Sequence, residues 1–112
     1  MIRVINKVEL LSSDIGWEFD GSEHGGVNVS FLIIAAPPGS GPQLHSHPYD
    51  EVFIVQEGQV TFTVGDETLK ATGGQIVIVP AGTPHKFVNS GTGLLRQVDI
   101  HLSPRFITNW LT

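Results

Sequence analysis

The sequence predicts an all-β protein, and three observations support that prediction. Apolar and polar residues alternate with a period of two along most of the chain, which is typical of strands with one buried face. Thirteen glycines and seven prolines interrupt the 112 residues, so the strands are expected to be short and joined by turns. Only one short segment, near the C-terminus, has a helical pattern. Many short strands with one late helix indicate a small barrel or sandwich.

We expect strands wherever the alternating pattern runs unbroken between glycines and prolines. These are residues 27–36, 51–55, 59–64, 67–71, 75–79, 85–88 and 94–102. Gly65 and Asp66 form the expected hairpin turn between the third strand and the fourth. A short helix is predicted over residues 104–111, because Ser103 can cap it, a proline opens it and its apolar residues group on one face.

The composition restricts the classes of partner and the compartment. The length fits one domain, residues 1–112. The formal charge is −5 and the six basic residues are scattered, so we expect no nucleic-acid partner. We expect no membrane partner either, because no apolar run is long enough to span a bilayer. The chain has no cysteine and no signal-peptide pattern, so a cytoplasmic protein is expected, and any metal it binds must have nitrogen and oxygen ligands.

Three histidines and one glutamate stand out as candidate metal ligands. His45 and His47 are two residues apart, so in an extended segment both side chains leave the same face. Glu51 follows four residues later, and His85 lies far downstream beside a Pro-x-Gly turn. Three imidazoles and one carboxylate suit a divalent transition metal and leave coordination positions open. This donor set accepts iron, manganese, nickel, copper or zinc.

The spacing of these residues resembles the two motifs of the cupin superfamily. In the first motif the spacings are five, one, three and six residues, and the chain supplies Gly39, His45, His47, Glu51 and Gly58. In the second motif the spacings are five, one, two and three residues, and the chain supplies Gly74, Pro80, Gly82, His85 and Asn89. Fifteen residues separate the motifs, and every motif position matches. Two motifs in the right order make the resemblance specific.

The resemblance implies a double-stranded β-helix, a conical jelly-roll barrel of six or eight strands. It also implies that His45, His47, Glu51 and His85 bind one metal ion inside that barrel. We interpret Gly39, Gly58, Gly74 and Gly82 as structural residues at positions that need positive φ or close backbone approach. We interpret Asn89 as a turn residue and not as a ligand.

Apolar residues near the ligands are the candidate substrate pocket. Phe53, Val55 and Phe87 have the same strand parity as the ligands, so we expect them to form the apolar wall of a cavity. Tyr49 and Asp50 lie between the ligands and could orient an imidazole, but exposure in a loop is the favoured interpretation.

Three polar residues near the end of the chain have two possible interpretations. Gln97, Asp99 and His101 share one face of the last long strand, which either faces solvent or contributes polar contacts to the cavity. The period-two pattern favours solvent. His24 lies in a glycine-rich loop, and we assign it no function.

The fold alone does not determine the activity, because cupins have unrelated functions. Basic residues are remote from the motifs and Lys86 points away from His85, which disfavours phosphate and oxalate substrates. We therefore expect a metal-dependent small-molecule enzyme of dioxygenase or oxidoreductase type, with Glu51 as a ligand that also acts as a catalytic base. The alternative is a non-catalytic module that binds a small molecule. A homodimer is expected, in which residues 2–5 add a strand to the partner.

Overall fold

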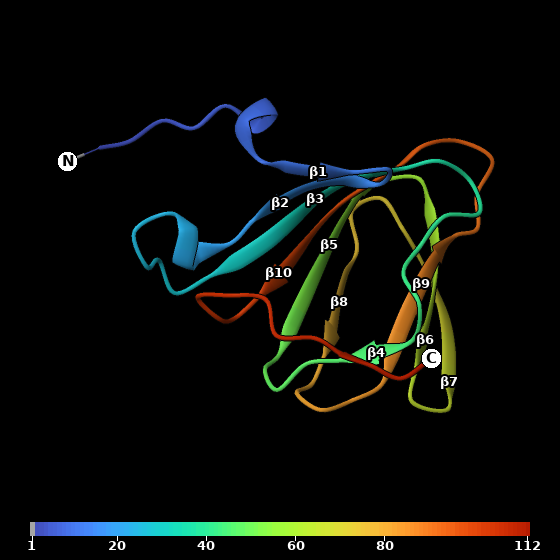
Figure 1. The fold of residues 1–112 in the computed structure, drawn as a ribbon. Coiled ribbons are helices and arrows are strands. Elements are labelled where there is room, and N and C mark those ends of the chain that lie inside the picture. Colours follow the sequence, from blue (N-terminus) through green and yellow to red (C-terminus); the bar gives the residue numbers. More distant parts are fainter. Residues whose placement is uncertain (1) are drawn as a thin grey trace.

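The structure is a computed structural model that describes residues 2–112, so Met1 of the predicted domain lies outside the described residues. Its strands form two antiparallel sheets that face each other (Figure 1). The strand order is β1-β2-β3-β10-β5-β8 in one sheet and β11-β4-β9-β6-β7 in the other. The strands in residues 2–112 are β1 (Leu11–Ser13), β2 (Gly16–Phe19), β3 (Ser30–Ala36), β4 (His45–Ser46), β5 (Glu51–Glu57), β6 (Gln59–Val64), β7 (Glu67–Thr72), β8 (Ile76–Val79), β9 (His85–Asn89), β10 (Leu95–His101) and β11 (Asn109–Trp110).

The apolar core lies between the two sheets, because alternate side chains of each strand point inward. The pattern is clearest in β9 and β10, where buried residues alternate strictly with less buried ones. Phe62 on β6 lies opposite Phe87 on β9, and both pack against Phe53 from the facing sheet. The buried apolar residues are Ile34, Ala36, Phe53, Val55, Val60, Phe62, Ala71, Val79, Phe87 and Leu95.

The all-β prediction is confirmed, and every predicted strand is present, all but one of them with a shifted end. The strand over 59–64 has the predicted bounds, whereas the first predicted strand begins at Ser30 rather than at residue 27. The sequence pattern did not predict β1, β2, β4 and β11. In β1 all residues are exposed and no alternation marks the strand. Strand β2 forms by pairing with β3, a contact that local pattern does not reveal.

The predicted C-terminal helix over residues 104–111 is wrong. This segment is extended, and it crosses in front of the barrel to place β11 beside β4 (Figure 1). Isolated helices of this length are marginal, and here other groups bind the backbone. The Phe106 amide donates to the Asp20 carboxylate, the Ile107 amide to the Tyr49 hydroxyl and the Leu111 amide to the Leu44 carbonyl. Tertiary hydrogen bonds therefore replace the helical ones.

The prediction for the motif glycines is confirmed, since Gly39, Gly58, Gly74 and Gly82 all have positive φ. Gly82 shows why this matters for the site. Its φ is 78°, a conformation that side chains disfavour, and its amide donates to the His47 carbonyl at 2.7 Å. That hydrogen bond joins the loop before β9 to the His-x-His segment.

The described helices are two single 3-10 turns, η1 (Lys7–Glu9) and η2 (Gly21–Glu23). Neither is long or apolar enough to cross a bilayer.

Candidate metal centre

The four motif residues meet at one end of the barrel although they come from three different strands and a loop. His45 lies on β4 directly opposite His85, the first residue of β9, and Glu51 is the first residue of β5. All four side chains are buried. Their candidate ligand atoms lie within 4.8 Å of one another, and the set is His45, His47, Glu51 and His85. The sheet register thus brings together residues that are up to forty positions apart.

Backbone carbonyls orient the three motif histidines. In each case the ring Nδ1 lies within hydrogen-bond distance of a carbonyl oxygen: Gln43 at 2.7 Å for His45, Ile107 at 2.8 Å for His47 and Thr83 at 2.9 Å for His85. A carbonyl only accepts, so Nδ1 carries the proton and donates it. In a neutral ring Nε2 then has the lone pair, which is available to a metal at the common centre. This is the arrangement in which proteins present imidazole to a metal.

Glu51 is surrounded by imidazoles. Its Oε1 lies 3.0 Å from Nε2 of His85 and 3.2 Å from Nε2 of His47, and its Oε2 lies 3.0 Å from Nε2 of His101. Burial acts to raise the pKa of Glu51, but the contacts with His101, His47 and His85 outweigh it and hold that pKa far below the usual range of a carboxyl. Glu51 is therefore an anion in the folded protein.

A divalent transition metal fits this arrangement. The Nε2 atom of His47 is buried without an aligned hydrogen-bond partner, although Glu51 lies nearby. A lone pair of this kind is costly to bury unless something binds it. Burial also lowers the pKa of His45 to about 4, so its ring is neutral near pH 7 and free to bind a cation. Three imidazoles and one carboxylate, all buried, could hold one metal ion.

The favoured prediction for the polar face of the last long strand is wrong. Gln97, Asp99 and His101 point into the barrel and are 0%, 2% and 3% exposed. The reason is that β10 is a central strand, paired with β3 on one side and β5 on the other. His101 is level with Glu51, and Asp99 is level with Phe53. The alternation itself was visible in the sequence, but it does not tell which face is inside.

Asp99 is a buried carboxyl group without a cationic partner. It lines the cavity beside the candidate metal centre, and its Oδ1 accepts a hydrogen bond from Nε2 of Gln97 at 2.9 Å. Burial, together with the negative charge of Glu51, raises its pKa well above the usual value. Asp99 therefore tends to be a neutral acid that can donate a hydrogen bond into the cavity.

The predicted exposure of Tyr49 is also wrong. Its ring is half-buried and stacks on His47, and its hydroxyl lies 2.7 Å from Nδ1 of His101. Asp50 is exposed as predicted, and its carboxylate accepts a hydrogen bond from the Ala81 amide. Asn89 is a turn residue, since its side chain bonds the backbone of residues 36, 91 and 93.

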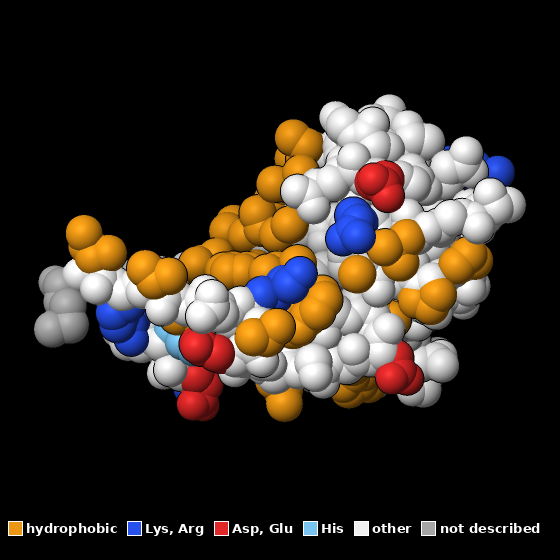
Figure 2. All heavy atoms as spheres, turned by 90° about the horizontal axis from the view of Figure 1, so that it is seen from above, with side chains coloured by type: hydrophobic (Ala, Val, Ile, Leu, Met, Phe, Trp, Pro, Cys, Tyr) orange, Lys and Arg blue, Asp and Glu red, His pale blue; other side chains and the backbone are white. Residues whose placement is uncertain are grey.

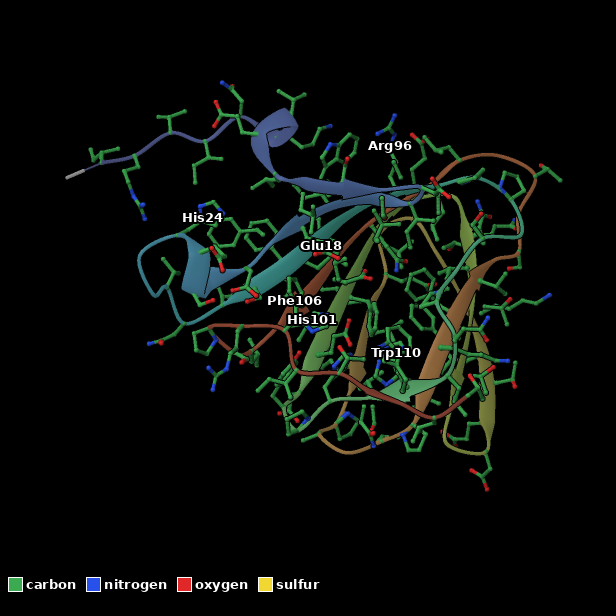
Figure 3. All side chains as sticks on the ribbon, in the orientation of Figure 1. Glu18, His24, Arg96, His101, Phe106 and Trp110 are labelled. Carbon is green, nitrogen blue, oxygen red and sulfur yellow. The ribbon has the colours of Figure 1, made fainter. Side chains whose placement is uncertain are left out.

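A cavity of about 240 Å³ is lined by three of the four candidate ligands, His45, His47 and Glu51. Phe53 and Phe87 line it, whereas Val55 is buried in the core and does not reach it. Other apolar lining residues are Ile15, Leu32, Ile34, Pro42, Phe106 and Trp110. Figure 3 shows Phe106 beside His101 and Trp110 in the C-terminal segment that crosses the barrel. His24 lies apart from this group beside η2, where it stacks on Phe19.

No lysine or arginine of residues 2–112 lines the cavity. Arg96, on the same strand as His101, is exposed and points away from the barrel (Figure 3). Glu18, Glu51 and Asp99 are the acidic lining residues. The described lining is therefore apolar and acidic, and apart from a bound metal it has no lysine or arginine that could pair with a phosphate or carboxylate ligand.

Curated proteins similar to this chain include two from Streptomyces. An uncharacterized protein of Streptomyces coelicolor is 40% identical over 60 residues, which are 54% of this chain and 57% of that protein. Polyketide synthase CurC of Streptomyces cyaneus is 37% identical over 81 residues, which are 70% of this chain and 52% of that protein. The chain thus spans about half the length of these relatives.

Among solved structures, the fold is similar to that of oxalate decarboxylase from Bacillus subtilis, a protein with Mn(II) centres. The TM-score is 0.80 at 21% identity, and the match covers 91% of this chain and 29% of that one. At this identity the likeness concerns the fold alone. The model of the Cupin domain family matches residues 32–101, which is more than half of the chain and includes both motifs. The chain belongs to the cupin family.

Proposed function

We propose that this cupin is a metal-dependent enzyme of oxygenase or oxidoreductase type that acts on a small neutral or aromatic molecule. One observation carries the proposal: three imidazoles and one carboxylate lie within 4.8 Å of one another, and three of these four residues line an apolar cavity. A divalent metal bound there would supply redox chemistry or polarise a substrate oxygen. Manganese and iron are the first candidates for the metal, since the structurally similar oxalate decarboxylase has Mn(II) centres and imidazole with carboxylate suits both.

The charges of the cavity support a substrate without a phosphate or carboxylate group. Such a group would favour a cationic side chain beside the metal, and the described lining residues include no lysine or arginine. Phe53 and Phe87 offer aromatic surface for stacking, and Asp99, as a neutral acid, can donate to a carbonyl or hydroxyl oxygen. We therefore place the substrate against the two phenylalanines with its polar end toward the metal ligands.

Glu51 has two roles in this proposal. Its depressed pKa keeps it ionised, which suits an anionic ligand. A carboxylate with so low a pKa is a weak base, so it accepts a substrate proton only after one of its imidazole contacts has been exchanged.

The enzyme proposal predicts turnover that depends on added metal. Protein loaded with iron, manganese or copper should consume oxygen or convert a substrate from an aromatic, diketone or sugar-like panel. The Glu51→Ala variant should lose at least about 100-fold in rate, the lower range expected for general acid–base groups. Phe53→Tyr, by contrast, should keep its metal and change substrate preference. Metal-loaded protein that binds panel compounds but converts none would replace this proposal with the non-catalytic binding module.

We also propose a homodimer in which the N-terminal segment contacts the partner. Figure 1 shows this segment extending away from the barrel, and Figure 2 shows apolar side chains along it. Ile2 and Val4 are 94% and 88% exposed, which is unfavourable unless another surface covers them. Light scattering should give twice the monomer mass at micromolar concentration. The Val4→Asp variant should shift to monomer, the control Leu69→Asp should not, and a wild-type monomer would contradict the proposal.

A further inference from the structure

We propose that Tyr49 and His101 are positioning residues that hold Glu51 for metal binding through one oxygen, with His101 donating to Glu51 and not binding the metal. The inference rests on the proposed metal site. It concerns a fourth histidine that belongs to neither motif and that lies beside the carboxylate, with Nε2 at 3.0 Å from Oε2 of Glu51. His101 is 3% exposed, and its buried Nε2 has no aligned hydrogen-bond partner in this structure, although Oε2 of Glu51 lies close to it.

The proton positions follow from the hydrogen bonds around Tyr49. The Ile107 amide donates to the Tyr49 oxygen at 3.2 Å, so the hydroxyl must send its own proton elsewhere. Two ring nitrogens are near: Nδ1 of His47 at 3.3 Å and Nδ1 of His101 at 2.7 Å. Nδ1 of His47 already carries a proton, which it donates to the Ile107 carbonyl at 2.8 Å. The Tyr49 hydroxyl therefore donates to Nδ1 of His101.

This assignment gives His101 the opposite tautomer from the motif histidines. If Nδ1 of His101 accepts, the proton of the neutral ring is on Nε2, which faces Glu51. Its Nε2 then has no lone pair for a metal. The Tyr49 hydroxyl carries a proton, as phenols do near pH 7, and it therefore remains a donor to His101.

Packing keeps the ring of His101 in this orientation. The ring contacts His47 edge-on at 4.5 Å between centroids and Phe106 edge-on at 4.9 Å. A flipped ring would place carbon atoms where Nδ1 and Nε2 now face the Tyr49 and Glu51 oxygens, so both contacts would be lost. The ring orientation is thus set by two polar contacts and two packing contacts.

As a consequence, the two carboxylate oxygens of Glu51 face different histidines. Oε2 faces His101, while Oε1 faces the motif histidines His47 and His85. Oε1 is the oxygen left for the metal, and His101 prevents the carboxylate from turning both oxygens toward it. Residues that orient a ligand in this way commonly change metal affinity by about 10- to 100-fold when they are removed.

The direct test is the protonation of each ring, measured by long-range ¹H–¹⁵N NMR on ¹⁵N-labelled protein, both metal-free and loaded with Zn²⁺. In the Zn²⁺-loaded protein we expect the proton on Nε2 for His101 and on Nδ1 for His45, His47 and His85, and for His101 we expect the same proton position in the metal-free protein. A proton on Nδ1 of His101, or on both of its nitrogens, would overturn the proposal. The metal-free sample also reports the tautomer of His101. A failure to bind Zn²⁺ would therefore contradict the proposed function, while the tautomer would still be tested by the metal-free spectrum.

Variants separate a positioning role from a structural or ligand role. His101→Gln keeps an amide N–H donor for Glu51, so we expect Zn²⁺ affinity within about threefold of wild type. His101→Leu has no donor, and we expect a loss of about 10- to 100-fold. Tyr49→Phe should redistribute the His101 proton between both nitrogens. His24→Gln is the matched control and should change neither. Equal losses in His101→Gln and His101→Leu would mean a ligand or a purely structural residue, contrary to the proposal.

Discussion

Replacing His85 with alanine should abolish stoichiometric metal binding. The wild-type protein should carry about one divalent metal per chain, held by the four buried groups that lie within 4.8 Å of one another. Loss of a residue that only orients a ligand costs about 10- to 100-fold in affinity, so loss of a ligand should cost more than about 100-fold. Elemental analysis of untagged protein, dialysed after loading with Mn²⁺ or Zn²⁺, measures this directly.

The same variant should lose the stabilisation that the metal provides. A ligand at 100 times its Kd stabilises the folded state by about 2.7 kcal/mol, which corresponds to roughly 10 °C or more in the Tm of a domain this small. Wild-type protein should show that rise on metal addition and His85→Ala should not. His24→Ala, which removes an imidazole beside η2, is the control and should keep both the metal and the rise in Tm. A fully loaded His85→Ala protein would refute the ligand set.

The metal-free protein should lose stability as the pH falls from about 6.5 to 4, and His45 should cause most of the loss. Burial lowers the pKa of His45 from 6.5 to about 4 in the folded state. The unfolded chain therefore binds a proton in this range that the folded chain does not, and unfolding becomes easier. The full difference corresponds to roughly 3 kcal/mol.

The titration of His85 and Glu51 limits the pH range in which the effect of His45 on stability can be measured. Burial acts to lower the pKa of His85, but the hydrogen bonds with Glu51 and the Thr83 carbonyl outweigh it and raise that pKa. His85 therefore stabilises the fold fully below about pH 6.5, and this contribution is lost as pH rises through its folded pKa. Glu51 has the depressed pKa of a paired carboxylate, so its contribution is lost only at lower pH, below its ordinary value of 4.5.

Urea denaturation of chelator-treated protein between pH 8 and 5 tests this prediction. Stability should be greatest near pH 6.5 and should decrease toward pH 5. His45→Gln carries no titrating group at this position, so its stability should decrease much less over the same range. A variant that follows the wild-type curve would assign the acid sensitivity to other groups.

The local pattern of the sequence determined the strands and the residues that could bind a metal. Period-two alternation located β5 to β10 because a strand with one buried face needs it, and the strand over 59–64 has its predicted bounds. The spacing of His45, His47, Glu51 and His85 was sufficient because His45 and His47 are near neighbours, and Glu51 and His85 each open a strand. His85 pairs with His45 across β9 and β4.

Only the tertiary structure decided what surrounds those ligands. Alternation shows that His101 and Asp99 share a face, but the pairing of β10 between β3 and β5 decides that this face is inside. Likewise, residues 104–111 have a helical pattern, yet hydrogen bonds to Asp20, Tyr49 and Leu44 hold them extended. The free energy of these long-range contacts exceeds local preference. For this reason the polar contacts of Glu51 and the cover of the cavity could not be predicted from the pattern alone.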